Sequence, residues 1–364
     1  MKKTIFLILG IVMVVVACEK DDDPMTPTSV PVVYDDTAYE LYIGSFPDPD
    51  IPADNALTQQ KVHLGKMLFY ETKLSALDNQ SCATCHRQSG AFSDTAQFSL
   101  GTFGDLGGRQ TMEVINLAWN TNGFFWDGRS PTLRHQSLQP IQNPVEMAET
   151  LDNVVAKLDQ EQMYKDQFIR AFGDDDITSE RMGLAMEQFM MTIVSNDSKY
   201  DRVLAGSVNF TESEQRGSDL FFAEYNPFFP DISGADCAHC HSGINFENDQ
   251  FMNNGLDTDA AFTDLGRFDF TGLDEDKAKF KVPTLRNIEM SPPYMHGGRF
   301  QTLEEVVDHY NEGIQISSTV DPAIANTEAT GLMLSEEDKT DLVNFLKTLT
   351  DDTFLNNLEY TDPF

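Results

Sequence analysis

The chain has 364 residues with 59 acidic and 25 basic side chains, which give a formal net charge of −34 at pH 7. A surface this acidic repels phosphate and excludes nucleic acid as a binding partner. Two interpretations of the charge stay open: it attracts a basic partner protein at low salt, or it only keeps the protein soluble.

Residues 1–17 have the features of an export signal. Two lysines are followed by an apolar run that is too short to span a membrane. The end of this run, Val15–Cys18, resembles a lipobox and predicts lipidation of the Cys18 sulfur. An ordinary signal peptide with an incidental cysteine is the alternative. Residues 18–50 begin with a stretch rich in Asp, Pro and Thr, which favours a disordered tether.

Two stretches of the form Cys-x-x-Cys-His are the clearest functional signal in the chain. Their residues are Cys82, Cys85 and His86 in the first and Cys237, Cys240 and His241 in the second. Each pattern predicts a c-type haem attachment site, in which both thiols bond to haem vinyl groups and the histidine binds the iron. The alternatives are a zinc half-site, which leaves the histidines unexplained, and a redox dithiol, which needs a βαβ context.

Two haems would allow multi-electron redox chemistry in one chain. Haem attachment through thioethers takes place outside the bacterial cytoplasm, so the export signal and the motifs agree. With Cys18 assigned to lipid and four cysteines to haem, no cysteine is left for a disulfide. We therefore expect two covalently bound haem c groups in a lipid-anchored protein of the cell envelope, on the periplasmic side or at the outer membrane.

Helical patterns recur along the chain, whereas strand patterns are sparse. A Gly-x-x-Leu-Phe sequence precedes each motif, at residues 65–69 and 217–221, and this repeat indicates two related halves. Apolar residues at helical spacing within residues 182–193 predict a core helix rich in methionine. Capping-box patterns at Thr211–Glu214 and Thr302–Glu305 each predict the start of a helix.

These patterns predict an all-α fold. Residues 51–205 and 206–364 are expected to form two cytochrome c-like haem domains, because each segment is long enough for one small domain. Long irregular loops rich in Gly and Asp are expected around the haems.

The motifs and their order resemble the bacterial di-haem cytochrome c peroxidase family, which includes the MauG-like enzymes. The resemblance extends from about Leu57 to Leu349. Besides the two haem motifs, the matching stretches are Phe125–Arg129, Asn143–Met147, Phe280–Asn287 and Tyr294–Phe300. The resemblance implies that the first domain holds the peroxide-reacting haem and that the second domain takes electrons from a donor.

The resemblance assigns three residues to the first haem site. Glu146 is the expected acid/base, which takes a proton from peroxide and returns it to the departing oxygen if an apolar pocket raises its pKa. Gln136 is expected to line the same pocket and hydrogen-bond bound oxygen, and Trp126 to lie between the haems on the electron path. Without the resemblance to the family, we would interpret Glu146 as a surface carboxylate and Trp126 as an aromatic residue of the core.

Two departures from the peroxidase pattern favour the MauG-like branch. Residues 87–134 contain no histidine, whereas reductively activated members carry one there that covers the resting haem, so we expect an open peroxide site. On the far side of the second haem, Tyr310 stands where typical peroxidases have a methionine and MauG-like enzymes a tyrosine. Helical spacing places Tyr310 on the inward face and His309 on the polar side; His309 and then Met295 are the alternative ligands.

A calcium ion commonly lies between the haems of this family. The corresponding ligand positions are Gln110, Ser291 and Pro293. Gln110 replaces the family's asparagine, and a calcium held by so few protein groups would complete its shell with water.

The expected reaction is reduction of hydrogen peroxide to water with electrons from a small cytochrome c or similar donor. The first alternative is MauG-like, peroxide-dependent oxidation of tryptophan or tyrosine in a partner protein. The second alternative is a non-catalytic di-haem electron carrier, which would have no use for Glu146 and Gln136. Family members often form homodimers, but nothing in this sequence requires one.

Overall fold

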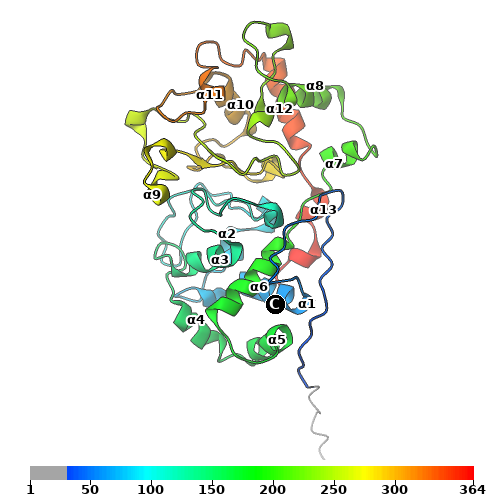
Figure 1. Cartoon of the computed structure of the whole chain (residues 1–364), viewed down its shortest axis with the longest axis vertical. Coiled ribbons are helices and arrows are strands. Elements are labelled where there is room, and N and C mark those ends of the chain that lie inside the picture. The colour runs from blue at the N-terminus through cyan, green and yellow to red at the C-terminus, as the bar shows by residue number, and fades with distance from the viewer. Residues whose placement is uncertain (1–30) are drawn as a thin grey trace, which may run out of the picture. The chain divides into compact units, whose positions relative to one another are not determined.

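The computed structural model describes residues 31–364, of which residues 33–364 form one compact unit (Figure 1). The expected signal peptide and the lipid site at Cys18 lie outside the described residues. Within the described part of the chain, no helix is long and apolar enough to cross a membrane.

The fold is built mainly from helices, as the sequence patterns predict, and contains little strand. The α-helices are α1 (Gln59–Tyr70), α2 (Cys82–Cys85), α3 (Leu133–Gln142), α4 (Leu151–Leu158), α5 (Gln162–Phe172), α6 (Ser179–Met191), α7 (Lys199–Leu204), α8 (Glu212–Phe222), α9 (Phe268–Thr271), α10 (Leu303–Glu312), α11 (Pro322–Ala325), α12 (Glu336–Lys347) and α13 (Asp352–Leu355). The strands β1 (Phe251–Met252) and β2 (Phe280–Lys281) pair in antiparallel register.

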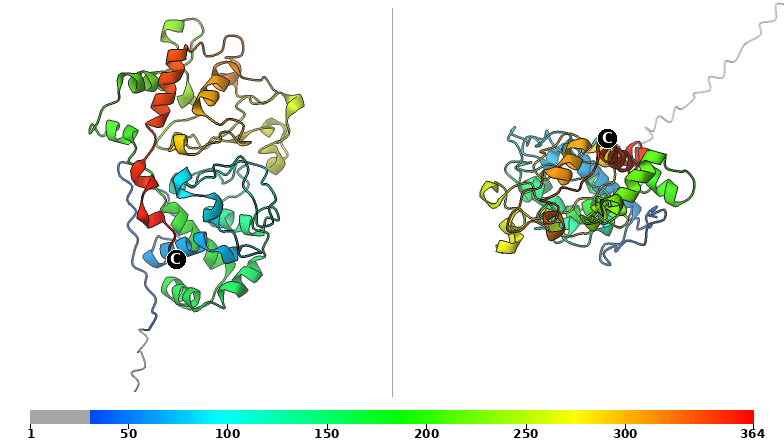
Figure 2. Two further views of the ribbon diagram at one scale, coloured as in Figure 1. Left: turned by 180° about the vertical axis from the view of Figure 1, so that it is seen from behind. Right: turned by 90° about the horizontal axis from the view of Figure 1, so that it is seen from above.

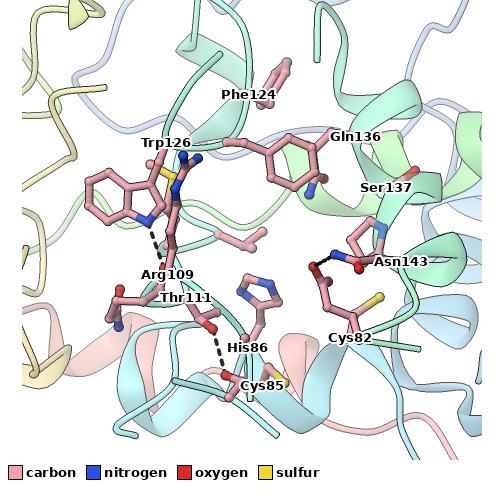
Figure 3. Close-up of a pocket in the computed structure, with 18 of the residues that line it drawn as sticks. Cys82, Cys85, His86, Arg109, Thr111, Phe124, Trp126, Gln136, Ser137 and Asn143 are labelled. Atoms are coloured by element: carbon pink, nitrogen blue, oxygen red, sulfur yellow. Dashed lines mark hydrogen bonds between the residues drawn. The ribbon is translucent and has the colours of Figure 1, made fainter. Parts of the chain in front are cut away.

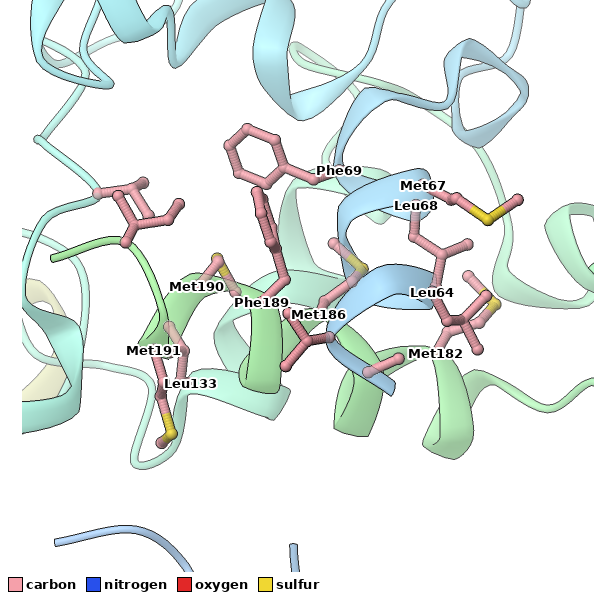
Figure 4. Close-up of a cluster of buried hydrophobic side chains, with 14 of the residues drawn as sticks. Leu64, Met67, Leu68, Phe69, Leu133, Met182, Met186, Phe189, Met190 and Met191 are labelled. Atoms are coloured by element: carbon pink, nitrogen blue, oxygen red, sulfur yellow. The ribbon is translucent and has the colours of Figure 1, made fainter. Parts of the chain in front are cut away.

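Helix α1 packs along α6 and forms the first of two large hydrophobic clusters (Figure 4). The packing is close because Gly65 has no side chain: a Cβ there would lie 2.0 Å from the carbonyl oxygen of Ala185. The predicted methionine-rich helix contributes to this core, since Met182 and Met186 of α6 are fully buried. Other buried members of the cluster are Leu64, Leu68, Phe69, Phe168, Phe189 and Ile193.

Helix α8 packs along α12 in the same way and forms the second cluster. A Cβ on Gly217 would lie 1.9 Å from the carbonyl oxygen of Asp341, so this glycine has the same role as Gly65. The repeated Gly-x-x-Leu-Phe sequence therefore marks two equivalent helix pairs, which lie apart from each other (Figures 1 and 2). Helices α8 and α10 begin at the predicted capping boxes of Thr211 and Thr302.

Residues 31–58, the described part of the chain before α1, contain no helix but are attached to the folded body. The Asp35 amide donates to the carbonyl oxygen of Arg170 at 3.0 Å. Phe46 is buried, and its ring packs edge-on against Trp119 with centroids 5.3 Å apart. Part of the segment expected as a tether therefore packs on the compact unit.

The C-terminal segment returns to the first cluster. Phe354 and Tyr360 are buried there, and both rings pack against Phe92 at centroid distances of 5.8 and 6.0 Å. The expected boundary at residue 206 gives these residues to the second domain. In the structure, this last part of the chain completes the core of the first half.

Candidate functional site

The first Cys-x-x-Cys-His motif lines a cavity of about 590 Å³. Helix α2 spans Cys82 and Cys85, and His86 follows at its end. His86 Nδ1 donates to the carbonyl oxygen of Phe92 at 2.9 Å, which leaves Nε2 free to bind a metal. Burial lowers the pKa of His86, so the ring is neutral at pH 7, and burial raises the pKa of the Cys82 thiol to about 12. These groups fit the attachment of haem c.

An acid and an amide line the same cavity. Glu146 and Gln136 both face it, and Asn143 Nδ2 donates a short hydrogen bond to Glu146 Oε1. Burial raises the pKa of Glu146, while the Asn143 bond and the charge of Arg129 oppose this rise. Figure 3 shows the His86 ring and the Gln136 amide directed at the same open space. The fold therefore brings together the residues that the sequence predicts for a peroxide site.

Trp126 joins the first cavity to the second half of the chain. Its indole lines the cavity, is 8% exposed, and donates from Nε1 to the carbonyl oxygen of Gln110 at 2.8 Å. The Lys281 amide donates to the Trp126 carbonyl oxygen at 2.7 Å, and the Phe280 ring lies edge-on to the indole at 6.5 Å. Phe280 stacks in turn on His296, with 3.6 Å between centroids. Trp126, Phe280 of β2 and His296 thus form a continuous series of aromatic contacts that begins at the cavity.

The second motif lines a smaller cavity of about 80 Å³. Cys237 begins the 3₁₀ helix Cys237–His239, and Cys240 follows its end. His241 Nδ1 donates to the carbonyl oxygen of Phe246 at 3.0 Å, which resembles the bond of His86 in the first site. Burial lowers the pKa of His241 to about 4 and raises that of Cys240 to about 12. The donor groups fit haem c, but the space would have to widen: Met252 Sδ lies 3.3 Å from Cys240 Sγ.

Of the three predicted far-side residues, Tyr310 lines the second cavity. Its hydroxyl lies 3.5 Å from Asn254 Nδ2, and burial raises its pKa. His309 is buried rather than on the polar side, and its Nε2 lies 3.0 Å from the carbonyl oxygen of Asn254. The placement of His309 by helical spacing was wrong because this loop carbonyl covers that face of α10. Met295 Sδ lies 3.1 Å from Asn254 Nδ2 and does not line the cavity.

Comparison with known proteins assigns the chain to a family. A family model described as di-haem cytochrome c peroxidase matches residues 59–209. The methylamine utilization protein MauG of Methylorubrum extorquens is 37% identical over 303 residues, which cover 82% of this chain and 80% of that protein. The chain belongs to the di-haem cytochrome c peroxidase family.

Other members of this family are also similar over most of their length. The cytochrome c551 peroxidase of Nitrosomonas europaea is 35% identical, with 79% of each chain covered. A crystal structure of a MauG-like protein associated with microbial copper homeostasis superposes with a TM-score of 0.81 and 32% identity, covering 90% of this chain and 99% of that one. Membership makes this chain a haem-dependent oxidoreductase that acts on peroxide. Both MauG proteins and peroxidases are among the relatives, so the similarity alone does not choose between the branches.

One of the three positions expected to bind calcium lines the first cavity, and the other two are buried. Gln110 lines this cavity, its amide N–H donates to the carbonyl oxygen of His296 at 2.7 Å, and its side-chain Nε2 donates to that of Asp94 at 3.1 Å. Ser291 and Pro293 are buried, and within the described residues the Ser291 hydroxyl has no hydrogen-bond partner. Amide and hydroxyl oxygens such as those of Gln110 and Ser291 are the hard ligands that Ca²⁺ prefers.

The sequence assigned no role to three polar residues of the first cavity. Asn143 had a local signal, because it precedes Glu146 by three residues and can reach it across one turn. Lys281 and Arg109 had none, because their contacts come from distant segments. The Lys281 ammonium is buried 2.8 Å from Asp249 Oδ1, and the Arg109 guanidinium lies between two aspartates at 2.7 Å from each.

Proposed function

We propose that this chain reduces hydrogen peroxide to two molecules of water, with two electrons drawn from a small cytochrome c or similar donor and two protons taken up from solvent. The observation that carries the proposal is the position of Glu146, a carboxyl group with a raised pKa in the cavity that His86 lines. Haem c bound through Cys82 and Cys85, with His86 on its iron, would supply the redox centre.

In this proposal, the side chains of the cavity transfer protons and position the peroxide. Glu146 as a carboxylate can take the proton that peroxide loses, and as an acid it can return this proton to the oxygen that leaves as water. The raised pKa makes the Glu146 carboxylate a stronger base towards the peroxide proton. Asn143 holds Glu146 Oε1 in place, and the Gln136 amide can donate to a peroxide oxygen.

Steady-state oxidation of a reduced donor tests this proposal. The haem-loaded protein is mixed with peroxide and reduced cytochrome c, and cytochrome oxidation and peroxide loss are recorded together. We expect a saturable rate and two cytochromes oxidised for each peroxide. Loss of peroxide without oxidation of any donor, including a small-molecule one, would contradict it.

Asn143→Ala is expected to shift the pH dependence of this reaction. The variant loses a hydrogen bond that stabilises the Glu146 carboxylate, so the pKa of Glu146 should rise further. Because only the carboxylate accepts a proton, kcat/KM for peroxide should begin to fall at a higher pH than in the wild type. Asn153→Ala is the matched control, since Asn153 makes a similar hydrogen bond to Glu149, which does not line the cavity. Superimposable profiles for Asn143→Ala and the wild type would disprove the role of Asn143.

The proposal also covers the haem domains, the resting state of the first site, a calcium ion and a lipid anchor. We propose two cytochrome c-like domains with one covalently bound haem each, supported by the equivalent pairs α1–α6 and α8–α12. We propose that the first site is open in the fully oxidised protein, because His86 is the single histidine among the described residues that line it. We also propose that a calcium ion binds at Gln110. Lipidated Cys18 would anchor the protein in the cell envelope.

MauG-like oxidation of a partner's aromatic residue is the second candidate, and the position of Tyr310 in the second cavity favours it. Tyr310→Phe should change the absorption spectrum of the second haem, because the iron would lose an oxygen ligand. Tyr225→Phe is the control: Tyr225 lines the same cavity, but its hydroxyl bonds to Thr330. An unchanged spectrum in Tyr310→Phe would exclude ligation. A lasting spectral change when peroxide alone is added to the oxidised wild type would support this candidate.

A further inference from the structure

A loop beside the second haem site exposes three large apolar side chains. The apolar loop (residues 225–233) follows α8 and lies at the end of the compact unit farthest from α4 and α5 (Figures 1 and 2). Phe228, Phe229 and Ile232 in this loop are 85%, 63% and 71% exposed. None of the three lines the second cavity, so a haem bound there would leave them exposed.

The apolar loop has a defined conformation. The Gly234 amide donates to the carbonyl oxygen of Glu224 at 2.9 Å and closes the base of the loop. Within the loop, Asn226 Oδ1 accepts hydrogen bonds from the amides of Phe228 and Phe229 at 3.1 and 3.2 Å. These hydrogen bonds fix a loop conformation in which the apolar side chains stay exposed to water, so the side chains contribute no burial energy to the fold. An exposed apolar patch of this kind is typical of a protein interaction site.

The apolar loop is continuous with the second site. Tyr225 at its start and Ala235 and Asp236 just beyond its end all line the second cavity. A protein that contacts the loop would therefore lie close to the haem proposed there. Electron transfer needs such proximity, but only a brief and small contact.

Charge around the second motif selects the kind of partner. Residues 217–266 contain nine acidic side chains and neither a lysine nor an arginine. Three of the nine, Asp249, Asp257 and Asp264, pair with basic side chains from other segments, and the segment remains acidic overall. A partner with basic residues around an apolar contact area would be attracted over a distance and then held by the apolar loop.

We propose that the apolar loop is the docking surface of a small basic redox protein, which delivers one electron to the second site in each encounter. Its apolar area packs on Phe228, Phe229 and Ile232, and its lysine and arginine side chains face the acidic segment 217–266. Two encounters supply the two electrons that one peroxide consumes, and two donor molecules are oxidised. The proposal rests on the proposed peroxidase function, because it names the surface that the electron donor uses.

Kinetics with two donors of different size test the docking surface. The triple variant Phe228→Ser, Phe229→Ser and Ile232→Ser is compared with the wild type, using reduced mitochondrial cytochrome c as the basic protein donor. Ascorbate with tetramethyl-p-phenylenediamine is the small donor, which needs no docking. The control replaces three equally exposed apolar side chains elsewhere, in Tyr42→Ser, Leu204→Ser and Leu358→Ser.

We expect KM for cytochrome c to rise about tenfold or more in the loop variant, since exposed aromatic residues carry much of the energy of an interface. The rate with the small donor, the haem spectrum and the control variant should be unchanged, and KM of the wild type should rise with salt. An unchanged KM in the loop variant would overturn the proposal, as would a wild type that turns over with the small donor alone. A wild-type dimer that the loop substitutions dissociate without a change in KM would also overturn it. Absence of turnover with either donor would instead refute the peroxidase function on which the proposal rests.

Discussion

Replacement of Glu146 by glutamine is expected to slow peroxide reduction by about 10²- to 10⁴-fold, which is the usual contribution of a positioned acid/base. Glutamine keeps the shape of the side chain and its contact with Asn143, but it can neither accept nor return the peroxide proton. The loss should therefore appear in kcat/KM for peroxide, measured with saturating donor at several pH values. The decline in rate that the protonation of Glu146 causes at low pH should disappear in the variant.

The control for this substitution is Glu212→Gln, which changes an exposed carboxylate at the start of α8. It should leave the rate and its pH dependence unchanged. The haem spectra of both variants should match the wild type, which would show that the haem sites are intact. A Glu146→Gln enzyme with more than a tenth of the wild-type rate would show that another group moves the proton.

Arg286→Met is expected to destabilise the folded protein by about 3–5 kcal/mol, the usual result of removing one partner from a buried ion pair. Arg286 is 1% exposed, and its two terminal nitrogens lie 2.8 and 2.9 Å from the carboxylate oxygens of Asp201. Its Nε donates to the carbonyl oxygen of Ile244, just after the second motif. Methionine would leave Asp201 buried without a counter-charge, and the change in unfolding free energy is measured by chemical denaturation.

The pH dependence of this destabilisation has a definite sign. Burial alone would raise the pKa of Asp201, but the hydrogen bonds and the charge of Arg286 outweigh it and lower the pKa in the folded state. The stabilisation is therefore present above about pH 4 and is lost as the pH falls through the folded-state pKa. Lys73→Met, which breaks a half-exposed pair with Glu161, is the control and should cost at most about 1 kcal/mol. Equal effects of Arg286→Met and Lys73→Met would show that burial of the pair is unimportant.

The two haem sites differ in what their surroundings allow. The first cavity measures about 590 Å³, and the carboxyl group of Glu146 lines it. The second cavity is smaller, about 80 Å³, and Tyr310 lines it. This difference supports peroxide chemistry at the first site and electron entry at the second, where the apolar loop lies.

Local features of the sequence were enough to predict much of this arrangement. A Cys-x-x-Cys-His motif needs only one turn of chain, so the residues that we propose for haem attachment could be predicted from spacing alone. The capping boxes at Thr211 and Thr302 also act within four residues, and both helices begin there. The repeated glycines predict equivalent halves because close helix packing tolerates no side chain at Gly65 or Gly217.

Contacts between distant segments were decided only by the tertiary structure. Periodicity placed Tyr310 correctly on the inward face, but it misplaced His309 because it takes no account of the carbonyl oxygen of Asn254 that covers it. Lys281 reaches the first cavity from the second half of the chain, and Tyr360 returns to the first core. The sequence by itself determined the two haem motifs, the helix starts and the related halves, since each depends on neighbouring residues. Which remote side chain meets which site depends on how the two helix pairs and their loops pack, and no local pattern encodes that.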